Sequence, residues 1–116
     1  YPLPASCTAS ALAAVAPAPL AATRAGVATV VTERASLYGA LAKMPGVRRA
    51  YRSDANFVLA RFHDAQAAFD ALLGAGIVVR DLRGAPGLGD ALRISVGTPA
   101  QNAAVLAMLR TLRVAA

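Results

Sequence analysis

Two arginines lie in segments where strands are expected, and together they could bind an anion. Arg80 lies near the end of the apolar run "GIVVRD", and Arg93 lies in the middle of the run "ALRIS". If these strands pair through the Gly- and Pro-rich loop 82–90, the two guanidinium groups lie close together and could bind a carboxylate or phosphate bidentately. Alternatively, either arginine pairs with Asp81 or Asp90, or lies along the surface. The pattern alone favours neither interpretation.

Strand alternation indicates which way one of these side chains points. Over 91–97, Leu92 and Ile94 share one face, whereas Arg93 and Ser95 share the other. Burying a charged group is costly unless a group of opposite charge meets it. We therefore expect Arg93 to lie on the face of this strand that does not pack in the core.

The other residues with reactive side chains form no comparable pattern. His63 adjoins Asp64, an expected helix cap, so we expect it at the surface. Lys43 is the only lysine and could in principle form a Schiff base, but it lies at an expected exposed helix end. Cys7 is the only cysteine, which excludes an internal disulfide and fits a reducing compartment, and we expect it to be inert. The 6 acidic residues show neither paired-carboxylate nor metal-ligand spacing, so we expect no catalytic residue and no metal site.

The composition is that of a globular domain with a basic balance. Hydrophobic residues make up 57% of the 116 residues, and the net charge is +6. The longest apolar runs stop well short of the ~20 residues that span a membrane, and no basic segment precedes the apolar stretch 2–19 as in a signal peptide. The arginines are spread along the chain and do not alternate with Tyr or Phe. We therefore expect neither a membrane nor a nucleic acid among the partners.

Apolar periodicity and turn residues predict the element order α-α-β-β-α-β-β-α. Helices are expected at 8–16, 20–44, 65–76 and 99–112, and strands at 47–53, 56–62, 77–81 and 91–97. Helices that back a small, mainly antiparallel four-stranded sheet make an α+β two-layer sandwich, here with a long N-terminal helix. We expect a single domain, 1–116, in which 1–19 form an opening segment and short helix and 20–116 form the core.

Helix caps and buried faces follow from the same pattern. Asp64 is a good N-cap, and Thr98 with Gln101 forms a capping box that has proline at the first helical position. Glu33 and Arg34 belong to the polar side of the long helix. The helical residues expected to face the core are Val27, Val30, Val31, Leu37, Leu41, Ala68, Phe69, Leu72, Leu73, Val105, Met108, Leu109 and Leu112.

Three stretches resemble the C-terminal part of histidinol-phosphate aminotransferases. They are "LAKMPGVRRAYRSDANF", "SDANFVLARF" and "GIVVRDLRGAPGLGDALRISVGTPAQN". The opening "YPLP" resembles the segment where the chain leaves the large domain in that family. These are pyridoxal-phosphate enzymes of the aspartate aminotransferase superfamily (class I/II, fold type I). The resemblance covers essentially the whole chain and implies an α+β small domain that closes over the active site.

The resemblance also implies a function for the strand arginines. The family transfers an amino group between histidinol phosphate and 2-oxoglutarate in histidine biosynthesis. Its arginine in "LRIS" binds the carboxylate or phosphate of the substrate, and its arginine in "VVRD" assists. This implies that Arg93 and Arg80 bind substrate. Asn56, in the "ANF" match, is a further substrate-binding candidate.

The resemblance places the cofactor site outside these 116 residues. In the family, the lysine that holds pyridoxal 5'-phosphate and the aspartate that pairs with its pyridine nitrogen precede the "YPLP" segment. We therefore expect the isolated chain to hold no cofactor and to be inactive. The implied partners are the large cofactor-binding domain of a parent chain, a second copy of that parent in a cytoplasmic homodimer, and an anionic small-molecule substrate.

Other functions stay open at this point. A stand-alone ACT-like or ferredoxin-like ligand-binding module also has a small antiparallel sheet backed by helices, but it lacks the long helical stretch 8–44. Related aromatic aminotransferases and a phosphothreonine decarboxylase use similar small domains. A basic RNA-binding sheet would need aromatic residues on its central strands, and "VVRD" and "LRIS" offer none.

Overall fold

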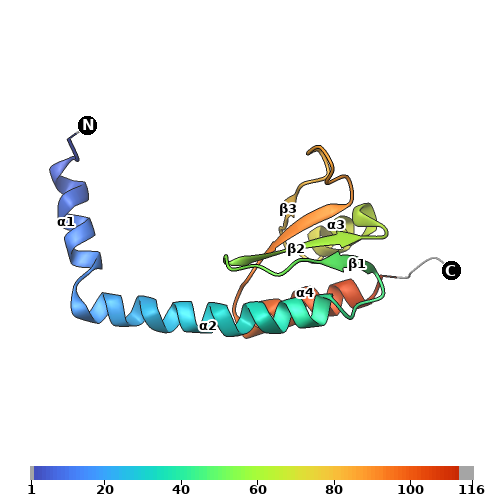
Figure 1. Cartoon of the computed structure of the whole chain (residues 1–116), viewed down its shortest axis with the longest axis horizontal. Coiled ribbons are helices and arrows are strands. Elements are labelled where there is room, and N and C mark those ends of the chain that lie inside the picture. The colour runs from blue at the N-terminus through green and yellow to red at the C-terminus, as the bar shows by residue number, and fades with distance from the viewer. Residues whose placement is uncertain (1, 113–116) are drawn as a thin grey trace.

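The computed structural model describes residues 2–112, which form four helices and a four-stranded sheet (Figure 1). In chain order, the elements are α1 (Ala5–Ala14), α2 (Pro17–Leu41), β1 (Val47–Ala50), β2 (Phe57–Phe62), α3 (Ala65–Gly74), β3 (Arg80–Asp81), β4 (Ala91–Ser95) and α4 (Pro99–Arg110). The predicted succession of helices and strands is confirmed.

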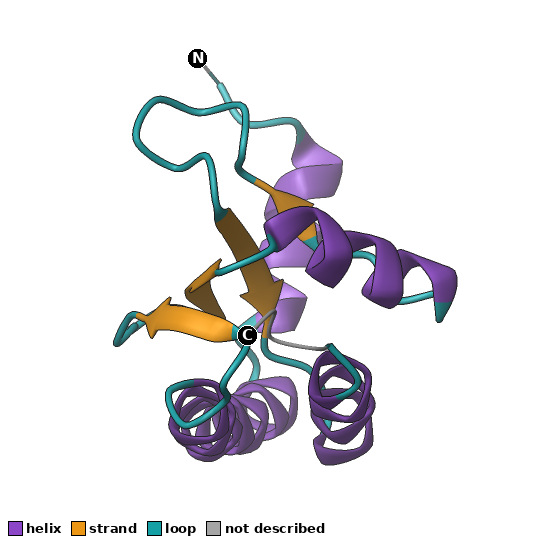
Figure 2. Ribbon diagram, turned by 90° about the vertical axis from the view of Figure 1, so that its right-hand side faces the viewer, coloured by secondary structure: helices purple, strands orange, loops and turns teal. Residues whose placement is uncertain are grey.

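The sheet is antiparallel throughout, with the strand order β1-β2-β4-β3. The central strands β2 and β4 pair from Phe57 with Ser95 to Arg61 with Ala91. The helices α2 and α4 lie side by side beneath the sheet, and α3 packs against β2, β4 and α4 (Figures 1 and 2). No helix among the described residues covers the other face, which we call the open face. This arrangement confirms the expected α+β two-layer fold.

The core lies between the covered sheet face and the helices. Its largest fully buried side chains are Phe62, Leu37, Leu41, Leu72, Leu92, Ile94, Leu109 and Val58. Each such side chain contributes about 1.5–3 kcal/mol by leaving water. Alternate residues of β4 are buried, so Arg93 and Ser95 lie on the open face, as the alternation predicted.

Only the last turns of α2 reach this core. Leu37 and Leu41 are fully buried, whereas Val27 is 57% exposed, Val31 is 48% exposed and Val30 is half-buried. The predicted buried stripe is therefore wrong over the first part of the helix. Helical spacing shows which side chains share a face, but it does not show how far the covering surface extends. In Figure 1, α1 and the first half of α2 project to the left of the sheet.

The boundaries of the first two helices differ from the prediction. α1 starts at Ala5, and α2 starts at Pro17, because proline is tolerated in the first helical turn, where its missing N–H had no intrahelical partner. α2 ends at Leu41, so Lys43 follows the helix rather than lying in its last turn. Within residues 2–112, no single helix has the length and hydropathy of a membrane span, and α1 and α2 meet that test only together, across a 68° bend.

The strands are shorter than predicted. β3 lies at the edge of the sheet and comprises only Arg80–Asp81 of the predicted 77–81. The first residues of the predicted strand belong instead to the turn that follows α3. There the N–H of Ile77 bonds to the C=O of Leu72, and Gly76 adopts a φ of 75°, which favours glycine. β1 and β4 likewise end earlier than predicted.

The starts of α3 and α4 are as predicted. Asp64 accepts a hydrogen bond from the N–H of Ala67 (2.9 Å), and Thr98 and Gln101 form the reciprocal capping box. The predicted inward residues that are buried or partly buried are Ala68, Phe69, Leu72, Val105, Met108, Leu109 and Leu112. Leu73 is 50% exposed, and its assignment to the core is wrong because the core-facing stripe of α3 passes one position before it.

Candidate functional site

Arg80 and Arg93 lie directly opposite each other on the open face, and we call them the arginine pair. β3 pairs with β4 through the loop 82–90, as expected, and the register joins Arg80 to Arg93. Directly opposed residues of an antiparallel pair share a face and have Cβ atoms about 4.5–5.5 Å apart. Both side chains are exposed. An anion that approaches the open face at β3 and β4 would therefore meet two arginine side chains that start from opposed positions.

Neither member of the arginine pair is neutralised by a nearby acid. Asp81 and Asp90, the acids at the two ends of the loop, form their ion pairs with other arginines. Within residues 2–112, no carboxylate lies within 4.0 Å of Arg80 or Arg93. The alternative that Asp81 or Asp90 pairs with either arginine is therefore wrong, and both charges are available to a ligand.

The start of the loop is held by Asp81 and Arg83. Arg83 donates from Nη2 to Oδ2 of Asp81 (2.7 Å), and from Nε and its backbone N–H to Oδ1 (both 2.9 Å). Its Nη1 donates to Gln66 of α3 (2.6 Å), and its guanidinium carbon lies 5.1 Å from the ring centroid of Phe69. The side-chain and backbone hydrogen bonds from Arg83 lower the pKa of Asp81 to about 2. Asp81 is therefore ionised at neutral pH, with its charge already balanced.

The end of the loop is held by Asp90. Arg61 donates from Nε to Oδ1 of Asp90 (2.6 Å), and Arg48 donates from Nη2 to Oδ2. Arg61 also donates from Nη2 to the C=O of Gly87 inside the loop (3.1 Å). Partial burial raises the pKa of Asp90, but the hydrogen bond from Arg61 and the charges of Arg48 and Arg61 outweigh it and lower the pKa overall. Both ends of the loop are thus fixed by arginine–aspartate contacts.

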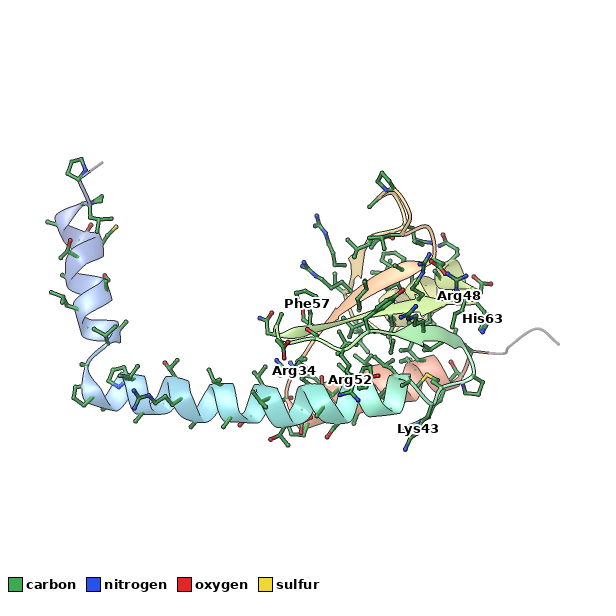
Figure 3. All side chains as sticks on the ribbon, in the orientation of Figure 1. Arg34, Lys43, Arg48, Arg52, Phe57 and His63 are labelled. Atoms are coloured by element: carbon green, nitrogen blue, oxygen red, sulfur yellow. The ribbon has the colours of Figure 1, made fainter. Side chains whose placement is uncertain are left out.

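Arg93 has an aromatic partner that sequence reasoning missed. Its guanidinium carbon lies 5.0 Å from the ring centroid of Phe57, within the range of a cation–π interaction. The register pairs Phe57 with Ser95, so Phe57 reaches Arg93 diagonally across β2 and β4. Phe57 lies at the left end of the sheet, above Arg34 of α2 (Figure 3). The alternation of each strand could be read from the sequence, but the register between the strands could not.

Arginines from all four strands share the open face. Arg49 of β1 lies opposite Arg61 of β2, and the register places both on the face of Arg80 and Arg93. The guanidinium carbon of Arg49 lies 4.6 Å from the ring centroid of Tyr51. The sequence shows no alternation of arginine with Tyr or Phe, yet strand pairing brings Arg93 against Phe57, because it joins positions that are distant in sequence.

Asn56 lies beside a different groove. Its C=O accepts a hydrogen bond from the N–H of Val96 (2.8 Å), which joins the start of β2 to the end of β4. The residue is exposed and, with Val27 and Arg34, lines a groove of about 500 Å³ between α2 and the turn before β2. The structure places Asn56 with this groove, and its contact with substrate stays a prediction.

The described residues do not fit pyridoxal phosphate. Enzymes hold this cofactor through a lysine Schiff base. Lys43, the only lysine, is exposed and points away from the sheet (Figure 3). His63 and Cys7 are also exposed. A cofactor pocket would need groups that residues 2–112 do not contribute.

Known proteins match the chain over its full length, although no family model matches it. All 116 residues align with the histidinol-phosphate aminotransferase of Stenotrophomonas maltophilia (strain R551-3), at 59% identity. The same length aligns with that of Xanthomonas oryzae pv. oryzae (strain MAFF 311018), at 51% identity. The chain matches about a third of a histidinol-phosphate aminotransferase. It spans 32% of the length of each of these curated relatives.

Solved structures agree with these aminotransferase matches. The crystal structure of the histidinol-phosphate aminotransferase from Clostridium acetobutylicum has a TM-score of 0.65 and 27% identity, over 71% of this chain and 25% of that chain. A decarboxylase from Sulfurospirillum multivorans has a TM-score of 0.62 and 28% identity, over 70% of this chain and 24% of that chain. The expected α+β fold is confirmed, and the histidinol-phosphate aminotransferase matches do not favour the alternative functions.

Proposed function

We propose that the chain is the substrate-anion-binding part of a histidinol-phosphate transaminase. The observation that carries this proposal is the arginine pair, two directly opposed cations on an open sheet face without a carboxylate partner among residues 2–112. The names of the relatives support the reaction class. The parent enzyme exchanges an amino group between histidinol phosphate and 2-oxoglutarate, in the biosynthesis of histidine.

The opposed positions of the arginine pair would let both side chains reach one anion with several oxygens. Like charges directly opposed in a sheet are destabilising, by up to about 1 kcal/mol. A phosphate or carboxylate between Arg80 and Arg93 would remove this repulsion and would accept charge-assisted, bidentate hydrogen bonds. The two substrates carry such groups, a phosphate on one and carboxylates on the other.

The ion pairs at the ends of the loop support the same role. Asp81 and Asp90 keep lowered pKa values because arginines other than the arginine pair donate to them. Each acid is therefore neutralised where it stands and does not compete for Arg80 or Arg93. The hydrogen bonds also fix the loop beside the site, so that the surroundings of the arginine pair are ordered before a ligand arrives.

The rest of the activity belongs, in this proposal, to a larger partner. The chain spans 32% of its relatives, which implies a further domain. That large domain of the parent chain binds pyridoxal 5'-phosphate, which supplies the electron sink for amino transfer when it is bound. The parent acts as a homodimer in the cytoplasm, and the isolated chain is inactive.

Titration with inorganic phosphate tests the anion site in the 116-residue chain. Saturable shifts of the Arg80 and Arg93 Nε–H NMR signals are expected. Arg80→Ala and Arg93→Ala should each weaken binding several-fold, since an ion pair at an exposed site contributes up to about 1 kcal/mol. Arg24→Ala, at an exposed arginine of α2, is the matched control. If all three variants weakened phosphate binding equally, the affinity would depend only on the net charge of the chain and not on the arginine pair.

A further inference from the structure

Two consecutive residues of α2, Glu33 and Arg34, hold the two strand ends that frame the arginine site. Arg34 donates from Nη1 to the C=O of Ala55 (2.9 Å), in the turn before β2, and its Nη2 lies 3.9 Å from Asp54. Glu33 accepts at Oε2 from the side-chain N–H of Asn102 (2.9 Å). Both residues were assigned from the sequence to the polar side of the helix, yet both reach into the folded domain.

Asn102 links Glu33 to the end of β4, because its side chain hydrogen-bonds to both Glu33 and the backbone of Gly97. It is 5% exposed, and its Oδ1 accepts from the N–H of Gly97 (2.9 Å) while its Nδ2 donates to the C=O of Gly97 (3.1 Å). A Cβ at Gly97 would lie 2.6 Å from Oε1 of Gln101, so the backbone here packs tightly against α4. The segment that follows β4 is therefore held by α4, the next helix in the chain, and through Asn102 also by α2.

The two held segments are joined to each other. The N–H of Val96 donates to the C=O of Asn56 (2.8 Å), and the next pair along is Phe57 with Ser95. Phe57 carries the ring beneath Arg93. Arg34 thus holds the chain just before Phe57, and Glu33 holds the chain just after Ser95, at the one end of the sheet where Phe57 and Arg93 meet.

We propose that Glu33 and Arg34 are positioning residues that set where the Phe57–Arg93 contact lies relative to α2. Glu33 and Arg34 are consecutive residues of one continuous helix, which extends past this point away from the sheet (Figure 1). A shift of α2 is then transmitted to both strand ends together. The anion-binding role of Arg93 rests on the proposed function, whereas the positioning of its contact with Phe57 does not.

The decisive measurement is the ring-current shift that Phe57 imposes on the Arg93 Nε–H signal in the 116-residue chain. Glu33→Ala and Arg34→Ala are each expected to reduce this shift by more than half. Glu33→Gln should retain it, because an amide oxygen still accepts from Asn102. Arg24→Ala, on the same helix, should leave it unchanged. An unaltered shift in both alanine variants would overturn the proposal.

Amide hydrogen exchange separates positioning from general loosening. The amides of Val96 and Gly97 should exchange at least tenfold faster in the alanine variants. The amide of Phe62, which bonds to the C=O of Asp90 at the other end of the sheet, should exchange at the wild-type rate. Equal acceleration at both ends would contradict a local positioning role.

Phosphate titration then tests whether the position of the Phe57–Arg93 contact affects anion binding by Arg93. Both alanine variants should bind phosphate several-fold more weakly than wild type, and Glu33→Gln should restore the affinity. Wild-type affinity in the alanine variants would contradict positioning of Arg93 for its ligand. If the wild-type chain itself did not bind phosphate, the proposed function would fail, and the ring-current shift would still decide whether Glu33 and Arg34 position the contact.

Discussion

The guanidinium carbon of Arg93 lies 5.0 Å from the ring centroid of Phe57, and the two residues come from neighbouring strands. An exposed arginine carries up to about 2 kcal/mol of rotamer entropy, which a ligand contact must overcome. By holding the guanidinium near one place before a ligand arrives, the ring lowers this cost. The same contact leaves the N–H groups at the edge of the guanidinium free to donate.

Replacing Phe57 should therefore weaken anion binding without removing any charge. Phe57→Leu is expected to lower phosphate affinity two- to fivefold, since a cation–π contact at an exposed site contributes about 0.5–1 kcal/mol. Phe57→Tyr keeps a ring in place and should retain the affinity. Calorimetric titration of phosphate into wild type, Phe57→Leu and Phe57→Tyr measures these affinities. If Phe57→Leu bound phosphate as tightly as wild type, the ring would have no part in binding.

Removing one charge of the arginine pair should stabilise the chain while impairing the site. Arg80 faces Arg93 directly, so Arg80→Gln relieves a like-charge repulsion of up to about 1 kcal/mol. In urea unfolding without phosphate, the variant should have a higher midpoint than wild type. With phosphate present, wild type should gain stability and the variant should gain less. A lower midpoint for Arg80→Gln without phosphate would mean that Arg80 has a stabilising partner.

Acid should remove a specific contribution of Asp81 to stability. Its pKa is lowered from 3.8 to about 2 in the folded chain, so folding favours the ionised carboxylate. The stabilisation is present above the unfolded-state pKa and is lost as the pH falls through the folded-state pKa, between about 4 and 2. Asp81→Asn should be less stable than wild type at neutral pH, and the difference should disappear near pH 2. A difference that is the same at both pH values would contradict the ion pair with Arg83.

The reach of the core along α2 can be measured with two matched truncations. Leu37 of α2 is fully buried, and Leu37→Ala should lower the free energy of unfolding by about 2–5 kcal/mol. Val27 is 57% exposed, and Val27→Ala should change the unfolding free energy by no more than about 0.5 kcal/mol. Urea denaturation measures both, and a large loss at Val27 would show that something covers this part of α2 in solution.

Pyridoxal phosphate should not form a defined adduct with the 116-residue chain. The only lysine, Lys43, is exposed. After addition of pyridoxal phosphate and borohydride, mass spectrometry should find less than one equivalent of the reduced cofactor attached to the chain. Lys43→Arg should remove the adduct at position 43. Stoichiometric reduction onto Lys43 at low cofactor concentration would contradict the assignment of the cofactor site to another domain.

Features set by one short segment of sequence were predictable. Features that depend on how strands pair, or on how far the sheet covers a helix, were not. The capping box of Thr98 and Gln101 and the open-face position of Arg93 follow from local spacing, and both are observed. The Phe57–Arg93 contact needs the register of two strands, which local spacing does not contain. The exposure of Val27 depends on how far the sheet extends beside α2, and helical periodicity gives no information about that distance.

The gathering of arginines from all four strands on one face also affects how fast a ligand arrives. Arg49, Arg61, Arg80 and Arg93 share this face, and Asp90 offsets only part of their charge. Such a surface produces a positive potential that extends about a Debye length into solution, roughly 10 Å at 0.1 M salt. Anions are drawn toward the sheet by this field before they contact any side chain, so the association rate should fall steeply with ionic strength while a neutral analogue shows no such dependence.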